Sequence, residues 1–135
     1  MSTVKQETLI NSIRTLVLER CENIKLIYLF GSHAHGLTNS QSDVDIAILG
    51  KTEFDPITRW QWQNELVTAL NNDVDLIDLL RASTVMQNQV IHQGLCIYDA
   101  ANYAVLFEMQ VMSMYQHLND ERADILKQHM ILPNE

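Results

Sequence analysis

Residues 26–50 read LIYLFGSHAHGLTNSQSDVDIAILG, and this stretch decides the fold. The apolar run 26–30 has the length of a buried strand, and Gly31-Ser32 follows it where the backbone must turn sharply. A polar segment then leads to a second apolar run that opens with Asp43-Val44-Asp45. The stretch therefore predicts a strand, a tight turn, a short helix, a polar loop and a second strand.

The turn at Gly31-Ser32 predicts an anion site. A helix that starts at Ser32 or His33 aims its free amide groups out of the turn, and Gly31 has no side chain to block a phosphate. Asp43 and Asp45 follow the strand period of two, so their carboxylates project from one face. Two adjacent carboxylates repel unless a cation joins them, and Mg²⁺ prefers carboxylates together with phosphate oxygens. These residues predict a site for a triphosphate and a divalent metal.

A third carboxylate is expected on the strand formed by residues 72–80, NDVDLIDLL. If this strand buries Val74 and Leu76 against the helices, as the second strand buries its own apolar residues, Asp75 lies on the open face with the other two aspartates. Asp78 is then excluded from that face. A β-bulge would exchange Asp75 and Asp78, so the choice depends on register.

The remaining helices follow from caps and spacing. A first helix carries Leu9, Ile13, Leu16 and Val17, and Asp55-Pro56 starts a second one that runs to about Asn71. We expect this second helix to bury Ile57, Trp60, Val67 and Leu70, which leaves Trp62 half exposed. Ser83 caps a third helix that ends at Gly94, and residues 95–98 form a short fourth strand.

A long helical segment covers about residues 100–130, with a possible break at Asn119-Asp120. This segment is longer than a helix that only has to cover a four-stranded sheet. Methionines such as Met109 and Met112 suit either a core or an adaptable contact surface, and the sequence leaves that choice open. The segment is the best candidate in the chain for docking a partner protein.

Composition bounds the class of protein. The 135 residues include 47% apolar and 19% charged residues, which predicts one globular domain. A net charge of −8 argues against a surface that grips nucleic acid. No apolar run approaches the ~20 residues of a membrane span, and Cys21 and Cys96 lack metal-type spacing, so we expect reduced thiols and a cytoplasmic protein.

The spacing of Gly31-Ser32, ten residues and then Asp43-x-Asp45 resembles the signature of the nucleotidyltransferase superfamily that shares the polymerase-beta palm. The resemblance covers about residues 24–100. It implies an α/β (α+β) fold with a small mixed four-stranded sheet, helices packed on one face and a long C-terminal helical segment. The small size is similar to that of the minimal members, the MNT-domain antitoxins that act beside HEPN-domain ribonuclease toxins.

The resemblance also implies an activity, a partner and roles for the site residues. AMP is transferred from ATP to a tyrosine hydroxyl of the HEPN toxin, within a hetero-oligomeric complex and without direct contact to nucleic acid. Gly31 and Ser32 hold the triphosphate, and Asp43 and Asp45 bind nucleotide through Mg²⁺, with two ions expected. Asp75 completes the second metal position and helps to draw the proton from the attacking hydroxyl.

Two other functions and one local question stay open. The protein could be a binding-only antitoxin that occludes the toxin, or a nucleotidyltransferase that acts on a small molecule such as an aminoglycoside. The family's turn often carries arginines where this chain has His33 and His35. Neutral imidazole binds phosphate less strongly, so the role of these two histidines is undecided.

Overall fold

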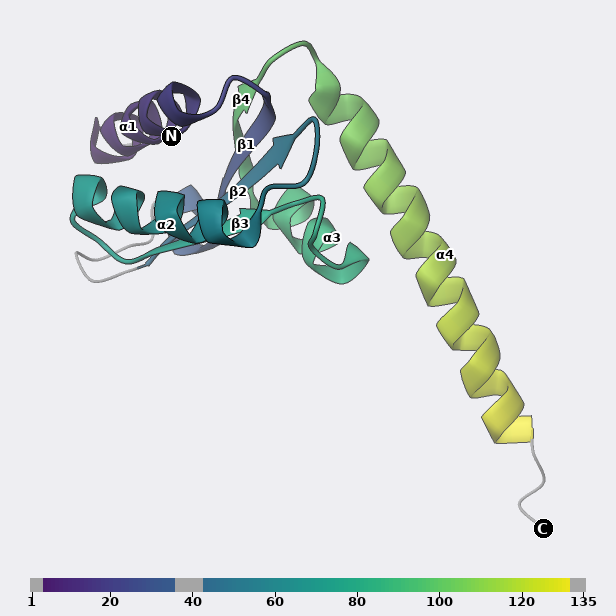
Figure 1. The fold of residues 1–135 in the computed structure, drawn as a ribbon. Coiled ribbons are helices and arrows are strands. Elements are labelled where there is room, and N and C mark those ends of the chain that lie inside the picture. Colours follow the sequence, from purple (N-terminus) through teal and green to yellow (C-terminus); the bar gives the residue numbers. More distant parts are fainter. Residues whose placement is uncertain (1–3, 36–42, 132–135) are drawn as a thin grey trace.

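A four-stranded mixed sheet forms the centre of the protein. The computed structural model describes residues 4–35 and 43–131. The strands are β1 (Ile24–Phe30), β2 (Val44–Gly50), β3 (Val74–Asp78) and β4 (Leu95–Asp99), in the order β3-β2-β1-β4 (Figure 1). β1 runs antiparallel to both β2 and β4, whereas β2 and β3 are parallel. The expected mixed four-stranded sheet is confirmed.

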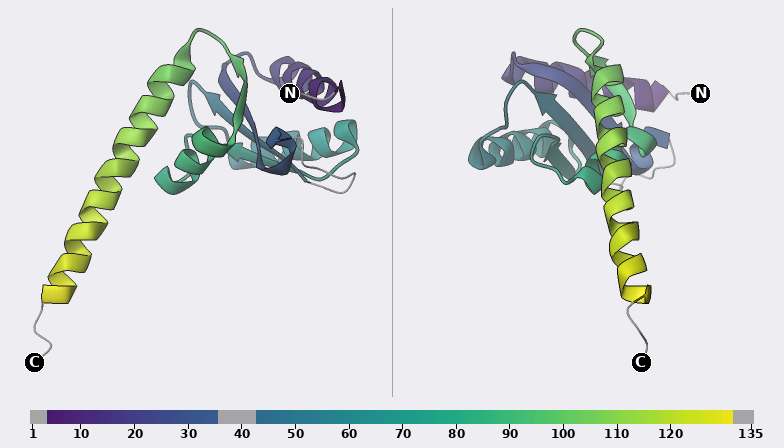
Figure 2. Two further views of the ribbon diagram at one scale, coloured as in Figure 1. Left: turned by 180° about the vertical axis from the view of Figure 1, so that it is seen from behind. Right: turned by 90° about the vertical axis from the view of Figure 1, so that its right-hand side faces the viewer.

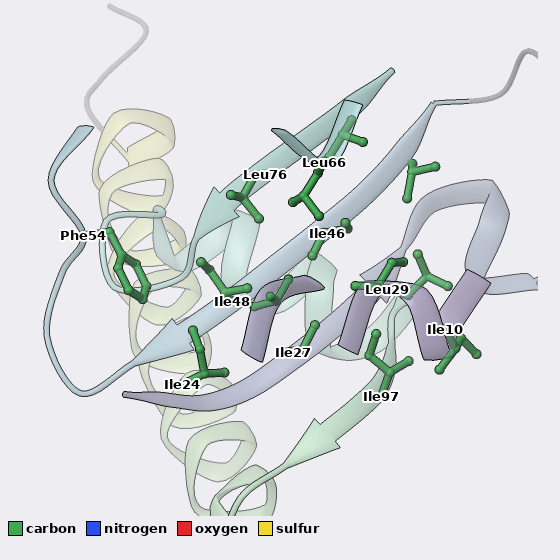
Figure 3. Close-up of a cluster of buried hydrophobic side chains, with 14 residues drawn as sticks. Ile10, Ile24, Ile27, Leu29, Ile46, Ile48, Phe54, Leu66, Leu76 and Ile97 are labelled. Carbon is green, nitrogen blue, oxygen red and sulfur yellow. The ribbon is translucent and has the colours of Figure 1, made fainter. Parts of the chain in front are cut away.

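Helices cover both faces of this sheet. They are α1 (Val4–Arg20), α2 (Pro56–Leu70), α3 (Thr84–Gln93) and α4 (Tyr103–Ile131), with a short 3₁₀ helix, η1 (Gly31–His35), after β1. α1 and α2 pack on one face, where Ile13 and Leu66 meet the sheet residues labelled in Figure 3. On the other face Val90 of α3 and Phe107 of α4 pack against Leu26 and Tyr28 of β1.

The expectation that the helices lie on one face therefore holds for α1 and α2 but not for α3. The physical reason lies in the strands, because residues 26–29 and 46–49 are buried without interruption. A strand that is apolar on both sides needs cover on both sides. α3 supplies that cover on the second face.

α2 turns a different side to the core than its sequence suggested. Trp60 and Ile57 are 58% and 66% exposed, whereas Trp62 packs against the core and meets Phe54 edge to face with 5.2 Å between the ring centroids. The prediction that Ile57 and Trp60 are buried is wrong, whereas Trp62 is partly buried, as expected. Trp62, Leu66 and Leu70 share one face at a spacing of four residues, and Leu66 is the most deeply buried of them.

α2 also protects the outer edge of the sheet at β3. Gln63 Oε1 accepts a hydrogen bond from Leu76 N at 3.0 Å, and Arg59 Nη1 donates to Leu76 O at 2.9 Å. These side chains occupy the backbone groups that an edge strand otherwise offers to another chain. β3, which carries two of the candidate aspartates, is thereby fixed in place.

α4 is one continuous helix of 29 residues, so the segment does not break at Asn119-Asp120. Asp99 accepts hydrogen bonds from Tyr103 N and Ala104 N at its start, and Tyr28 Oη donates to Glu108 Oε2 at 2.7 Å. Up to residue 128, as far as the structure describes side chains of this helix, Val111 is the last buried residue, and residues 120–128 are all exposed. Figures 1 and 2 show the C-terminal half of α4 running away from the sheet.

Most of the large exposed apolar side chains lie on α4. They are Val105, Leu106, Met109, Met112, Met114, Ile125 and Leu126. The open question about the methionines is thus decided, since Met109, Met112 and Met114 belong to an exposed surface and not to the core. In the described ranges, no helix has the length and apolar character needed to cross a membrane.

Candidate active site

Asp45 and Asp75 lie opposite one another on neighbouring parallel strands. They are Cα partners in the pairing of β2 with β3, and Val44 and Val74 beside them point into the core on the other face. Asp43 directly precedes β2 and is exposed. The parity argument therefore placed Asp45 and Asp75 on the same face correctly.

Asp78 has a different environment. It is only 3% exposed, and its carboxylate accepts hydrogen bonds from Phe54 N at 2.8 Å and from Leu80 N at 3.1 Å. The β2–β3 pairing continues without interruption from Val44↔Val74 to Ile48↔Asp78, so no bulge exchanges Asp75 and Asp78. Asp78 anchors the segment between β2 and α2, and Asp75 faces the candidate site.

The carboxylates repel one another at this site. Burial raises the pKa of Asp45 above its ordinary value of 3.8, and the negative charges of Asp75 and Asp43 raise it further. His33 acts in the opposite direction and lowers the pKa of Asp45. A half-buried carboxylate with two acidic neighbours is a position where a cation is stabilised.

The turn after β1 lies directly against Asp45. Gly31 has φ +70°, and a Cβ on this residue would overlap Asp45 Oδ2. Both constraints require glycine, because other residues rarely adopt this φ and none leaves room for the carboxylate. η1 confirms the expected short helix, with Ser32 exposed at its start. The polar loop over residues 36–42 and the side chain of His35 lie outside the described part of the chain.

Two residues near the turn had no clear signal in the sequence. His33 is close enough to Asp45 to affect its charge, although the sequence left its role undecided. Gln6 of α1 donates hydrogen bonds to the carbonyl oxygens of His33 and Ala34 at 2.9 and 3.0 Å. Contacts across 27 and 28 residues leave no trace in hydrophobic periodicity, so only the folded structure reveals them.

The candidate carboxylates can be compared with the ligands that Mg²⁺ prefers. Within the described residues, no group of three or more His, Cys, Asp or Glu side chains is arranged to hold a metal ion by itself. The donor set nevertheless fits Mg²⁺, since all three carboxylates supply oxygen and Asp43 and Asp75 lie near enough to raise the pKa of Asp45. Mg²⁺ commonly takes one or two carboxylates and completes its shell with phosphate oxygens and water.

The site consists of a strand, a glycine turn and a pair of aspartates, and the neighbouring parallel strand carries a third carboxylate. This arrangement is that of a nucleotidyltransferase. The family described as "Polymerase beta, Nucleotidyltransferase" matches residues 11–103, and the chain belongs to this family. A relative from Shewanella oneidensis, "Protein adenylyltransferase MntA", is 42% identical over 116 residues. The match spans 86% of this chain and 84% of the relative.

Solved structures give the same result at the level of the fold. A chain from a toxin–antitoxin crystal structure with AMP-PNP superimposes with a TM-score of 0.82 at 41% identity, over 90% of this chain and 98% of that one. A chain from a tri-AMPylated Shewanella oneidensis HEPN toxin in complex with MNT antitoxin gives a TM-score of 0.79 at 39% identity. That match covers 93% of this chain and 98% of the other.

Proposed function

We propose that this protein is an antitoxin and a protein adenylyltransferase, which transfers AMP from ATP to a tyrosine hydroxyl of a HEPN-domain ribonuclease toxin. The observation that carries the proposal is the position of Asp45, opposite Asp75 and against the Gly31 turn. Identity of 42% to a protein adenylyltransferase supports the activity and the acceptor class. A cytoplasmic location belongs to the same proposal, and the free thiols of Cys21 and Cys96 are consistent with it.

The turn provides the nucleotide contacts in this account. The exposed Ser32 hydroxyl and the backbone amides of η1 hold the triphosphate, because Gly31 lets the phosphates approach the backbone. The phosphates are then next to Asp45, whose carboxylate contacts the Gly31 backbone. Held by these contacts, the triphosphate presents its α-phosphorus for in-line attack.

The aspartates divide the chemistry between them. Asp43 and Asp45 would hold Mg²⁺, and Asp75 would complete a second metal position. Bound Mg²⁺ supplies positive charge that stabilises both the attacking oxygen and the departing pyrophosphate. The tyrosine oxygen forms a bond to the α-phosphorus while the bond to the bridging oxygen breaks, and the Asp75 carboxylate takes the hydroxyl proton. The products are an O-adenylylated tyrosine and pyrophosphate.

α4 is the surface that best fits the protein acceptor. Its exposed apolar side chains include Val105, Met109 and Met112, and methionine adapts well to a partner surface. α4 follows the edge strand β4, and β1 separates β4 from the strands that carry the aspartates. Docking of the toxin on α4 therefore leaves the nucleotide site free to act on a tyrosine of the docked partner.

Radiolabel transfer tests the proposed activity. Purified HEPN toxin is incubated with this protein, Mg²⁺ and ATP labelled at either the α- or the γ-phosphate. We expect label on the toxin from α-labelled ATP only, and none with Asp45→Asn. Toxin that is inhibited without any label would indicate a binding-only antitoxin, and label from the γ-phosphate would indicate phosphorylation instead.

A further inference from the structure

The side chain of Gln6 connects α1 to the turn that precedes Asp43. Gln6 is 9% exposed, and with Asp78 it is one of two polar or charged side chains that are buried in the described residues. Its Nε2 donates to His33 O at 2.9 Å and to Ala34 O at 3.0 Å. A single amide group thus satisfies two carbonyl groups at the C-terminal end of η1, where a helix leaves its carbonyls without intrahelical partners.

These hydrogen bonds restrict the conformation of the turn. The carbonyl of His33 belongs to the same planar peptide unit as the N–H of Ala34, and the carbonyl of Ala34 to the same unit as the N–H of His35. Fixing the carbonyls therefore fixes the orientation of these peptide groups, and the i→i+3 hydrogen bonds of a 3₁₀ helix carry this constraint back to Gly31 and Ser32.

Other contacts hold the same turn within the part of the chain that the structure describes. Gly31 lies against Asp45 at its start, and Ala34 packs against the hydrophobic core. Neither contact fixes the rotation of the peptide groups at the end of η1. The amide of Gln6 contacts those groups directly, so it is placed to determine their orientation.

We propose that Gln6 is a positioning residue for the nucleotide, which holds η1 in the conformation that binds the triphosphate. This inference rests on the proposed function, because it assigns a role in binding ATP. Gln6 does not touch the reacting atoms in this account. Its loss weakens nucleotide binding and raises the KM for ATP, and it has little effect on kcat once the nucleotide is bound.

Two substitutions remove the donors with little change in volume. Gln6→Met keeps an unbranched side chain of similar length, and Gln6→Glu keeps the shape but presents a carboxylate to the two carbonyls. Glu7→Gln is the matched control, because Glu7 is the exposed neighbour on α1 and the change is the reverse exchange of acid and amide. Each protein is tested for thermal unfolding, for the Kd of AMP-PNP with Mg²⁺ by calorimetry, and for KM and kcat in AMP transfer.

We expect the Kd of AMP-PNP and the KM for ATP to rise about tenfold in Gln6→Met and at least as much in Gln6→Glu. The kcat should change less than about threefold, and Glu7→Gln should match the wild type. A Kd within twofold of the wild type in both variants would overturn the inference. Failure of both variants to fold would also overturn it, since the role of Gln6 would then be structural. If the wild-type protein itself neither binds AMP-PNP nor transfers AMP, the proposed function fails, which is a separate outcome.

Discussion

Asp45 of β2 lies opposite Asp75 of β3, and the two carboxylates share one face of the sheet across a parallel pairing. This arrangement is unfavourable for the folded protein alone, because burial and like charge both raise the pKa of Asp45. In the proposed function, a divalent cation bound between the carboxylates would remove this repulsion. On that proposal, the site gives up some stability of the free protein in order to bind its substrate.

Asp45→Asn should abolish AMP transfer and slightly stabilise the free protein. We expect activity to fall about a thousandfold or more, because Asp45 is a proposed metal ligand and a bound metal ion contributes several kcal/mol to the stability of the transition state. The Tm without Mg²⁺ should rise by about 1 to 4 °C, since the repulsion from Asp75 and Asp43 is removed. Calorimetric unfolding and a transfer assay measure the two effects, and a large drop in Tm would contradict this explanation.

The stabilisation should depend on pH with a defined sign. The pKa of Asp45 is higher in the folded than in the unfolded protein, so the folded state binds more protons between these two pKa values. The contribution of Asp45 to stability therefore falls as pH rises from about 4 through the folded pKa, and Asp45→Asn lacks this contribution. The difference in Tm between the two proteins should be near zero below pH 4 and reach its full size above the folded pKa. A difference that shrinks with rising pH would contradict the assignment.

Asp75 and Asp78 should respond in opposite ways to the same substitution. Asp75→Asn should lose AMP transfer by at least about a hundredfold with little change in stability, because Asp75 is exposed beside Asp45. Asp78→Asn should lower the free energy of unfolding by about 1 to 3 kcal/mol, because an amide group then faces a backbone N–H that needs an acceptor. Its activity per folded molecule should stay near that of the wild type. Urea denaturation and the transfer assay separate the roles, and the reverse pattern would make Asp78 the catalytic carboxylate.

Gly31→Ala should damage the site through the backbone. At φ +70° an alanine costs about 1 to 2 kcal/mol, and its Cβ would displace the Asp45 carboxylate. We expect AMP transfer to fall at least about tenfold. Asn102→Ala is the control, because Asn102 has φ 60°, directly precedes α4 and lies away from the aspartates. Equal activity loss in both variants would show that backbone strain alone explains the effect.

A charge placed on the exposed apolar surface of α4 should weaken toxin binding. Met109 is 61% exposed, and Met109→Glu should raise the Kd for the HEPN toxin by about tenfold or more without changing the Kd of AMP-PNP. Gln110→Glu adds the same charge at the adjacent exposed position, away from Met109, and should have a smaller effect. Calorimetry with purified toxin measures both. Unchanged toxin binding in Met109→Glu would place the interface elsewhere.

The features that depend on the alternation of side chains along a strand could be predicted from the sequence. Alternation along β2 and β3 fixes which face each aspartate occupies, and the caps at Asp55 and Ser83 mark helix starts that the structure confirms. Gly31 was identified because only glycine suits a turn of this kind. These features depend on local chemistry.

The features that failed or were missed depend on long-range contacts. Trp60 and Trp62 are equally apolar, and only the position of Leu66 against the sheet decides which of the two packs on the core. The apolar residues of α4 have the spacing of a core helix, and nothing local shows that the sheet ends before the helix does. Gln6 meets its partners across 27 and 28 residues. The uninterrupted apolar runs of β1 and β2 do indicate that both faces of the sheet are covered. This pattern correctly predicts a helix on the second face, where α3 lies.

Intact-mass spectrometry of the HEPN toxin, isolated from cells that also produce this protein, tests the central claim most directly. The comparison is with cells that produce the Asp43→Asn/Asp45→Asn variant. We expect toxin that is heavier by whole AMP residues with the wild-type protein and unmodified with the variant. Toxin that is neutralised at its unmodified mass by the wild-type protein would contradict the catalytic account and leave a binding antitoxin.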